Sequence, residues 1–244
     1  MDYWYNDFLR SSLRNHFVLE ICITDECSLS CKFCCQATVE NKYKSHMSID
    51  DIELLSTYIN SYEFLVIKIS GGEPTIHPKF EQIVLNMRRW FKVHHYTLVT
   101  NGQLLLEYSD ILDNFDDIEI SHYIGINDNI VNQIKKSSIN VPIKFIERED
   151  NVSMHNVFSN PNLEKKNIFL RCRYPAWKKV VKNRIYPCSN IFGEAVREKI
   201  NLDKVSVVIG ETWRESLESL NIESYCQNCW VNVSDPIGRA CRIL

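Results

Sequence analysis

Three closely spaced cysteines follow an apolar, β-branched stretch near the start of this chain. Cys27, Cys31 and Cys34 read CxxxCxxC, directly after residues 17–24, whose side chains alternate as in a strand. Three thiolates on one short loop can hold three corners of a four-iron cluster, whereas the common ferredoxin arrangement uses four thiolates. The spacing therefore indicates an iron–sulfur cluster with one open iron. A structural zinc site or an electron-transfer cluster is the alternative for these thiols.

A second motif, Gly71, Gly72, Glu73, Pro74, ends the next apolar stretch. Adjacent glycines let a backbone approach a ligand closely, and a following carboxylate suits an ammonium group. With these two motifs the chain resembles the radical S-adenosylmethionine (SAM) superfamily, in which an aromatic residue, here Phe33, usually precedes the third cysteine. The resemblance implies that the three cysteines ligate a 4Fe–4S cluster whose open iron binds SAM, with Phe33 beside the cofactor. It also implies that the GGE segment receives the SAM amino group.

The same resemblance implies a reaction. In this family the methionyl amine and carboxylate of SAM chelate the open iron, and one electron cleaves the sulfonium. The resulting 5′-deoxyadenosyl radical abstracts hydrogen from a substrate. We therefore expect an external one-electron donor such as flavodoxin or ferredoxin.

Strand-like and helix-like stretches alternate along the first 170 residues. The pattern predicts two helices, at 49–59 after the capping Ser48 and at 80–91. It predicts strands at 17–24, 65–70, 96–100 and 117–122, with weaker ones at 142–147 and 167–170. Strands separated by helices indicate a parallel sheet. The fold class expected is α/β, and the resemblance implies a partial (β/α)6 TIM-like barrel as a radical SAM domain over residues 1–170.

Polar residues end the third and fourth predicted strands. Parallel sheets bind ligands at the carboxyl ends of their strands, where both motifs lie. Thr100 and Asn101 end the third strand and Ser121 ends the fourth. The resemblance implies that these residues approach the ribose and carboxylate of SAM. The alternative is a Thr-Asn-Gly turn and a serine that satisfies backbone groups.

A second cysteine set lies at Cys172, Cys188, Cys226 and Cys229. Residues 177–188 read as a β-hairpin with its turn at 182–184, and residues 210–220 as a short helix. This layout is similar to the twitch domain, the short form of the SPASM extension. The resemblance implies that residues 171–244 form such a domain and that the four cysteines hold an auxiliary 4Fe–4S cluster. Structural zinc and a purely structural cluster are the alternatives.

Eight basic residues and no acidic residue lie between positions 165 and 184. Such cations would raise the potential of a nearby cluster or attract an anionic substrate. The interpretation preferred from the sequence is a solvated hairpin whose lysines face water. The residues are Lys165, Lys166, Arg171, Arg173, Lys178, Lys179, Lys182 and Arg184.

Three cysteines remain. Cys22 lies within the first strand and is predicted to pack as a small apolar residue. Cys35, beside Cys34, is interpreted as a neighbour without a ligand role. Cys241 is the one weak catalytic candidate, because some family epimerases use a cysteine to donate a hydrogen atom to a substrate radical.

Composition limits the partners. The 244 residues carry a net charge of -3, with a pI near 6.2, so neither nucleic acid nor an anionic membrane is an expected partner. No apolar run is long enough to cross a membrane, and charges interrupt the amino-terminal segment that a signal peptide would need. We expect a cytoplasmic protein whose thiols stay reduced for metal.

The preferred function is oxidation of a small polar metabolite such as an aminocyclitol, sugar or nucleoside. The resemblance implies hydrogen abstraction by the SAM-derived radical, with the auxiliary cluster accepting the second electron. The first alternative is crosslinking, epimerisation or thioether formation in a ribosomal peptide; only 26 residues precede Cys27, which disfavours an amino-terminal leader-binding module. A radical epimerase and a non-catalytic iron–sulfur or zinc protein are the others.

Overall fold

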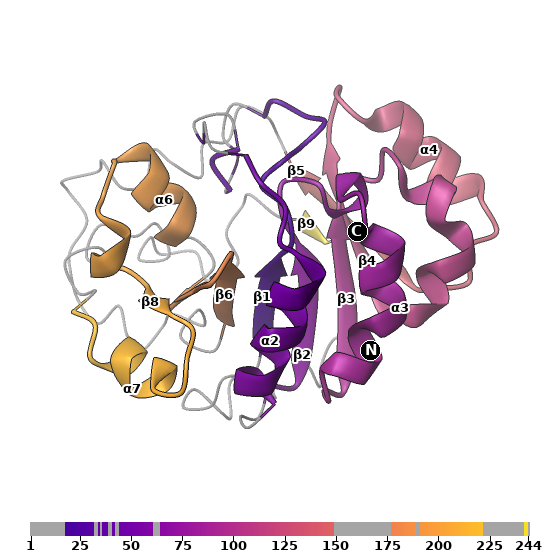
Figure 1. The fold of residues 1–244 in the computed structure, drawn as a ribbon. Helices are drawn as coiled ribbons and strands as arrows, with labels where there is room; N and C mark the ends of the chain where they lie inside the picture. The colour runs from indigo at the N-terminus through magenta and orange to yellow at the C-terminus, as the bar shows by residue number, and fades with distance from the viewer. Residues whose placement is uncertain are drawn as a thin grey trace.

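The computed structural model describes residues 18–31, 34, 36–38, 41, 44–60, 64–148, 177–188, 191–221 and 242–243. Within these ranges the chain forms one mixed sheet with helices packed against it (Figure 1). The strands are β1 (Val18–Cys22), β2 (Val66–Ser70), β3 (His95–Thr100), β4 (Asp117–Tyr123), β5 (Ile143–Arg148), β6 (Trp177–Val181), β7 (Arg184–Tyr186), β8 (Val207–Val208) and β9 (Arg242–Ile243). The helices are α2 (Ile49–Ile59), η1 (Pro74–Ile76), α3 (Phe80–Trp90), η2 (Leu105–Asn114), α4 (Asp128–Lys136), α6 (Ile191–Arg197), η4 (Leu202–Lys204) and α7 (Trp213–Glu218).

The order of the strands is β8-β7-β6-β1-β2-β3-β4-β5-β9. Strands β1 to β5 are parallel neighbours in chain order, as expected for successive βα units. The sheet is open, since β8 and β9 end it on opposite sides. The α/β fold of a partial TIM-like barrel is thus confirmed, whereas the strand predicted at 167–170 lies outside the described residues.

The carboxy-terminal hairpin joins this sheet. Strand β6 pairs in parallel with β1, on the side away from β2, and turns through a hairpin into β7. The hairpin turn was predicted correctly from the sequence, but its place beside the first strand was not. The boundary predicted near residue 170 and the twitch domain itself stay predictions, because residues 149–176 and 222–241 are not described.

Local signals account for the first helix. The Ser48 side chain accepts a hydrogen bond from the Asp51 amide, and the Asp51 carboxylate accepts one from the Ser48 amide. This reciprocal pair satisfies amide groups that a helix start otherwise leaves without partners. Helix α2 therefore begins at Ile49, as predicted.

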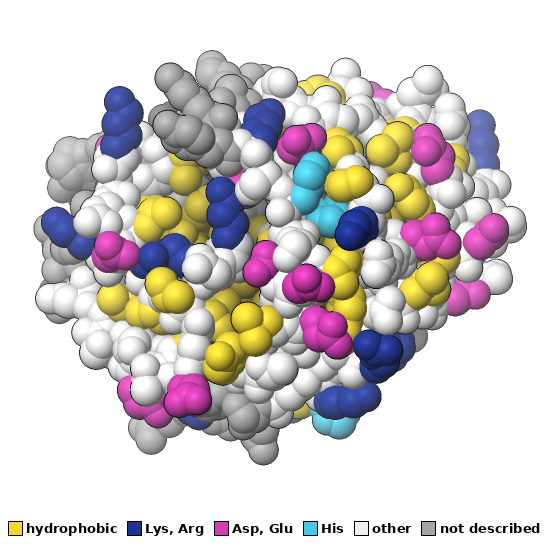
Figure 2. Space-filling view, in the orientation of Figure 1, with side chains coloured by type: hydrophobic (Ala, Val, Ile, Leu, Met, Phe, Trp, Pro, Cys, Tyr) yellow, Lys and Arg dark blue, Asp and Glu magenta, His cyan; other side chains and the backbone are white. Residues whose placement is uncertain are grey.

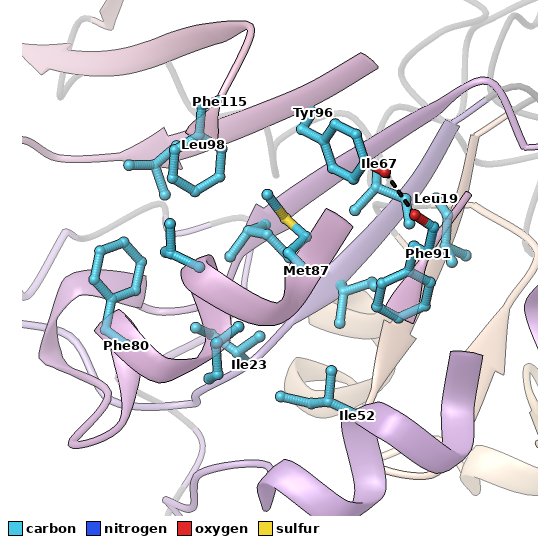
Figure 3. Close-up of a cluster of buried hydrophobic side chains, with 14 of the residues drawn as sticks. Leu19, Ile23, Ile52, Ile67, Phe80, Met87, Phe91, Tyr96, Leu98 and Phe115 are labelled. Carbon is cyan, nitrogen blue, oxygen red and sulfur yellow. Dashed lines mark hydrogen bonds between the residues drawn. The ribbon is translucent and has the colours of Figure 1, made fainter. Parts of the chain in front are cut away.

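An apolar core lies between the sheet and helices α2 and α3, which cover the same face of it (Figures 1 and 3). Alternate strand residues such as Leu19, Ile67 and Leu98 point to this side, as the two-residue period of a strand requires. The hydroxyl of Tyr96, buried in this core, donates to the Phe91 carbonyl oxygen at 2.6 Å. Its polar end is therefore satisfied inside the core.

A smaller apolar cluster lies at the β1–β6 side of the sheet. Cys22 and Val181 pack there with Tyr186 and with Phe192 of α6. Cys22 is 3% exposed, and burial raises the pKa of its thiol to about 12. The prediction that Cys22 packs as an apolar residue is confirmed.

The described residues on the face drawn in Figure 2 show no dominant charge. Acidic and basic side chains are interspersed over the face seen in Figure 2, with small apolar areas between them. Large apolar side chains that remain exposed include Leu54 of α2 and Leu85 of α3. Within the described ranges no helix combines the length and apolar character of a membrane span.

Candidate functional site

The cysteine loop leaves the carboxyl end of β1, as predicted. Cys27, Cys31 and Cys34 are all half-buried there, and the Cys34 amide donates to the Cys31 carbonyl oxygen at 3.3 Å. Beside the loop, the Asp25 amide donates to the Ser45 carbonyl oxygen at 2.9 Å. A hydrogen bond therefore joins Cys31 and Cys34, and the chain is anchored just before Cys27. Phe33 and Cys35 lie outside the described residues.

Hydrogen-bond donors surround two of the three sulfurs. Cys27 Sγ accepts from the Leu29 amide at 3.4 Å and from the Asn101 side-chain nitrogen at 3.9 Å, and Cys34 Sγ accepts from the Thr38 hydroxyl at 3.4 Å. Neutral thiols accept weakly, whereas thiolate ligands of an iron–sulfur cluster use such donors. This donor set fits cluster-bearing thiolates.

The thiols also interact electrostatically. Burial raises the pKa of Cys27, the Leu29 amide lowers it, and the negative charges of Glu73, Cys34 and Cys31 raise it, so that together they bring it to about 11. In the part of the chain that the structure describes, no three His, Cys, Asp or Glu side chains converge closely enough to hold a single metal ion.

The two glycines after β2 allow a close backbone approach to this loop. A Cβ atom at Gly72 would lie 2.1 Å from the Glu26 carbonyl oxygen, and one at Gly71 would lie 2.5 Å from the Thr24 carbonyl oxygen. The amide of Gly72 donates to Thr24 at 2.8 Å, and the amide of Glu73 donates to Glu26 at 2.7 Å. Glycine is required here because any side chain would separate the GGE segment from the cysteine loop.

Glu73 is fully buried and joins three segments. Its Oε1 accepts from the Thr75 hydroxyl and the Thr100 hydroxyl, both at 2.6 Å, and its Oε2 accepts from the Asn101 amide at 2.7 Å. Burial raises the pKa of this carboxyl more than these donors lower it. Glu73 therefore holds the ends of β2 and β3 together, and an incoming ammonium group would share the carboxylate with donors of the chain itself.

The other predicted SAM contacts lie at the same edge of the sheet. Thr100 donates to Glu73, whereas the side chain of Asn101 donates to the Ser28 hydroxyl at 3.1 Å, reaching across to the cysteine loop. Ser121 is 8% exposed and lies two residues before the end of β4, which continues to Tyr123. The structure thus brings the motif residues of β1 to β4 together, while their contacts with SAM stay predictions.

Asn127 belongs to this edge and was missed in the sequence. It is 2% exposed, and its side-chain nitrogen donates to the Asn101 carbonyl oxygen at 2.7 Å and to the Ser121 carbonyl oxygen at 2.9 Å. Its Oδ1 accepts from the Tyr123 amide at 2.8 Å. Asn127 therefore holds the ends of β3 and β4 in register. In the sequence Asn127 is recognisable only as an asparagine just before a helix, a pattern typical of an ordinary helix start.

Charged side chains cross the inner face of the sheet, the face opposite α2 and α3. The register aligns Lys179, Glu20, Lys68, Thr97 and Asp117 across β6, β1, β2, β3 and β4. The Lys68 ammonium lies 2.7 Å from both carboxylate oxygens of Glu119, and Lys179 lies 3.2 Å from Glu20 Oε1. Buried charges are tolerated where they are paired and hydrogen-bonded, as here.

This row corrects the interpretation of the basic hairpin. Lys178 and Lys179 are 7% and 1% exposed, so they do not face water. The Lys178 ammonium donates to the Pro187 carbonyl oxygen at 3.2 Å, and Lys179 pairs with Glu20. The prediction was wrong for these two lysines. For Lys179 the reason is a buried carboxylate, Glu20, which stabilises the ammonium and lies 159 residues away in the sequence. Lys182 remains half-exposed beside Asp25.

Asp117, at the amino end of β4, supports a prediction about acid stability. Burial by itself raises its pKa, but contacts with His95, Lys144 and Thr97 outweigh burial and hold the pKa well below its usual range. Asp117→Asn should lower the free energy of unfolding at pH 7 by roughly 2 kcal/mol. A carboxyl with a lowered folded pKa stabilises the fold above its unfolded pKa, about 3.9, and loses this effect as the pH falls toward the folded value.

Urea unfolding of both proteins between pH 7 and pH 3 tests this. The difference in the free energy of unfolding between wild type and Asp117→Asn should become smaller below about pH 4. The exposed Asp113→Asn serves as control and should stay within about 0.5 kcal/mol of wild type. A difference that is constant with pH would contradict the assignment.

Of the second cysteine set, only Cys188 is described. It lies just after β7, half-buried against the cluster that contains Cys22. Cys172, Cys226, Cys229 and the catalytic candidate Cys241 lie outside the described residues. The auxiliary cluster and the hydrogen-donor role of Cys241 stay predictions.

The family of this chain follows from a comparison of its sequence with protein-family models. The model of the radical SAM superfamily matches residues 21–158, more than half of the chain, and this range contains both the cysteine loop and the GGE segment. The chain belongs to the radical SAM superfamily. It is therefore an enzyme of the kind that uses SAM and a 4Fe–4S cluster, and its Cys27, Cys31 and Cys34, with their surrounding donors, fit that cluster.

Curated relatives match the amino-terminal part of this radical SAM chain. A GTP 3′,8-cyclase from Actinobacillus succinogenes is 29% identical to this chain over 94 residues. The matched region covers 36% of this chain and 27% of the cyclase. A probable GTP 3′,8-cyclase from Sulfolobus acidocaldarius is 28% identical over 131 residues, covering 53% and 40%. The chain thus spans less than half the length of these relatives.

Solved radical SAM structures show the same fold over most of the chain. BtrN in complex with AdoMet and 2-DOIA superposes with a TM-score of 0.63 at 14% identity, over 93% of this chain and 98% of BtrN. The enzyme anSMEcpe with bound AdoMet superposes with a TM-score of 0.56 at 13% identity, over 86% and 82%. At this identity the likeness establishes the fold and not the substrate.

Proposed function

We propose that this radical SAM enzyme oxidises a small polar metabolite such as an aminocyclitol, sugar or nucleoside. The observation that carries the proposal is the hydrophilic inner face of the sheet. Barrels normally fill this space with apolar side chains, whereas here Glu20, Lys68, Thr97 and Glu119 occupy it. These groups are buried or half-buried and the charged ones are paired, but they make the inner face hydrophilic. Hydrophilic surroundings suit a substrate rich in hydroxyl or amino groups, because each polar group needs a partner once it leaves water.

The likeness to BtrN supports the same class. It extends over nearly the whole of both chains, and BtrN was crystallised with AdoMet and a second compound, 2-DOIA. A peptide-modifying activity remains the alternative, because the fold, shared also with anSMEcpe, does not by itself select a substrate. The polar lining favours the metabolite.

In the proposed reaction the residues of this chain bind and position. Cys27, Cys31 and Cys34 would hold the cluster, which supplies reductive cleavage of SAM when it is bound. Glu73 and Asn127 fix the ends of β2, β3 and β4 against the loop, so that the cofactor and the inner face keep one geometry.

The overall oxidation balances as follows. The substrate loses one hydrogen atom from carbon to the 5′-deoxyadenosyl group, then one proton and one electron, leaving a carbonyl. An external flavodoxin or ferredoxin would supply the electron that cleaves SAM. The auxiliary cluster predicted at Cys172, Cys188, Cys226 and Cys229 would accept the substrate electron.

Product analysis tests the proposal. Anaerobic, reduced protein should convert SAM to 5′-deoxyadenosine and methionine, and a panel of aminocyclitols, sugars and nucleosides, GTP included, should reveal one substrate consumed in equal amount. Deuterium on the attacked carbon should appear in 5′-deoxyadenosine. Solvent deuterium in the product would instead indicate an epimerase, and SAM cleavage only with a peptide would indicate peptide modification.

A matched variant addresses the auxiliary cluster. Cys226→Ala should lower the iron content by about four per chain and abolish net oxidation, while SAM cleavage continues. Anaerobic iron and sulfide analysis, with zinc measured in parallel, checks this. One zinc in place of four irons would retain the SAM chemistry and remove the proposed electron acceptor.

A further inference from the structure

Three separate segments meet at the buried carboxylate of Glu20. Its Oε1 accepts from the Ser70 hydroxyl at 2.8 Å, the Gln36 side-chain nitrogen at 3.1 Å and the Lys179 ammonium at 3.2 Å. Ser70 ends β2, Gln36 belongs to the cysteine loop, and Lys179 belongs to the carboxy-terminal hairpin. Glu20 thus connects the hairpin with the loop that carries the cluster ligands.

Gln36 lies two residues after Cys34, in a turn with little freedom. The Ala37 amide donates to the Cys34 carbonyl oxygen at 3.0 Å, and the Thr38 hydroxyl donates to Cys34 Sγ at 3.4 Å. A displacement of Gln36 would therefore displace Cys34 and its donor together. The guanidinium of Arg197, from α6, also donates to the Cys34 carbonyl oxygen. Two residues from the carboxy-terminal part of the chain thus support one cluster ligand.

The Glu20–Lys179 pair is buried deeply enough to hold its position. The two side chains are 9% and 1% exposed. Burial alone would raise the pKa of Glu20, but Lys179, Ser70 and Gln36 together lower it, so the carboxylate stays charged. Removing Lys179 would leave this charge buried with two neutral donors, which is strongly unfavourable. The carboxylate would then move toward water and release Gln36.

We propose that Lys179 is a positioning residue for the SAM-binding cluster, acting through Glu20 and Gln36. The carboxy-terminal hairpin thereby sets the geometry of the Cys34 side of the loop, in addition to any auxiliary cluster that it holds. The inference rests on the family's cluster at Cys27, Cys31 and Cys34, and it is independent of the substrate. It predicts that the hairpin controls the spectroscopic properties of a cluster that it does not ligate.

Lys179→Met tests the proposal in the full-length, anaerobically reconstituted protein, with Lys178→Met as the matched control. Both substitutions remove one buried ammonium from adjacent positions of β6, but the Lys178 ammonium donates to Pro187 rather than toward Glu20. The readouts are iron content and the change in the electron paramagnetic resonance spectrum of the reduced protein on addition of SAM. Only the SAM-binding cluster contributes to that change.

We expect Lys179→Met to weaken or broaden the SAM-dependent signal and to reduce 5′-deoxyadenosine formation at least about tenfold. Lys178→Met should keep the wild-type signal. Adding Glu20→Gln to Lys179→Met removes the unpaired charge and should restore the signal. An unchanged signal in Lys179→Met, an equal loss in Lys178→Met, or a failure of the double variant to recover would each overturn the proposal.

Gln36→Leu keeps the test decisive if Lys179→Met does not fold. It breaks the connection on the loop side and leaves the Glu20–Lys179 pair intact. The same spectral change is expected, with a melting temperature close to that of wild type. A wild-type spectrum in Gln36→Leu would also overturn the proposal. Absence of any SAM-dependent signal in wild-type protein would instead refute the cluster assignment on which the proposed function depends.

Discussion

Cys27→Ala should abolish reductive cleavage of SAM and lower the iron content from about eight to about four per chain. The thiol of Cys27 is one of three that fit the SAM-binding cluster, and it accepts hydrogen bonds from Leu29 and Asn101. With only two cysteines of the motif remaining, no open iron corner is held in place. Iron and sulfide analysis of anaerobic protein, with chromatography of 5′-deoxyadenosine, measures both effects.

Cys22→Ser is the control for this variant. Cys22 lies at the end of the same strand, is buried beside an apolar cluster and is not a member of the motif. Its thiol donates to Gln36 Oε1 at 3.7 Å and contacts the Ser70 hydroxyl at 3.4 Å, and a serine hydroxyl can keep both contacts. The control should retain all iron and all SAM cleavage, at a cost of about 1 kcal/mol in stability. Formation of 5′-deoxyadenosine by Cys27→Ala at the wild-type rate would refute the assignment of the motif.

Gly72→Ala is expected to have the second large effect. The added Cβ would lie 2.1 Å from the Glu26 carbonyl oxygen and 2.5 Å from its carbonyl carbon, so two backbone segments would have to separate. The hydrogen bonds from the Gly72 and Glu73 amides to the cysteine loop would be lost with that separation. We expect a loss of about 3 kcal/mol or more in the free energy of unfolding, together with loss of SAM binding.

Gly210→Ala provides the comparison, because a Cβ atom there meets nothing within 4 Å. It should change stability by no more than about 0.5 kcal/mol. Urea unfolding measures stability, and equilibrium dialysis against labelled SAM measures binding. If Gly72→Ala bound SAM like wild type, the close approach of the GGE segment to the loop would have no functional role.

Short-range patterns determined much of the fold. The strand-like stretches of β1 to β4 and the capping box at Ser48 depend on neighbours in the chain, and the elements predicted from them agree with the observed ones within one or two residues. The helix predicted at 210–220 is shorter, at 213–218, and the helices η2, α4 and α6 were not predicted. The cysteine spacing and the GGE segment likewise identified the edge of the sheet that carries the site, since both follow parallel strands. Each of these signals is local, so a single sequence contains it.

Contacts over long sequence distances were decided by the tertiary structure alone. The hydrophobic pattern of residues 177–188 predicts a hairpin but not its pairing with β1, because the pairing partner is chosen across the whole sheet. The same pairing turns Lys179 from an expected surface residue into the partner of Glu20, and Gln36 into a link between them. Asn127 gains its role only when the ends of β3 and β4 are adjacent. The spacing of the cysteines and of the GGE segment thus identified the kind of reaction from the sequence alone. Which residues support the cysteine loop was decided by the tertiary structure, because the buried Glu20–Lys179 pair joins strands that are distant in the sequence.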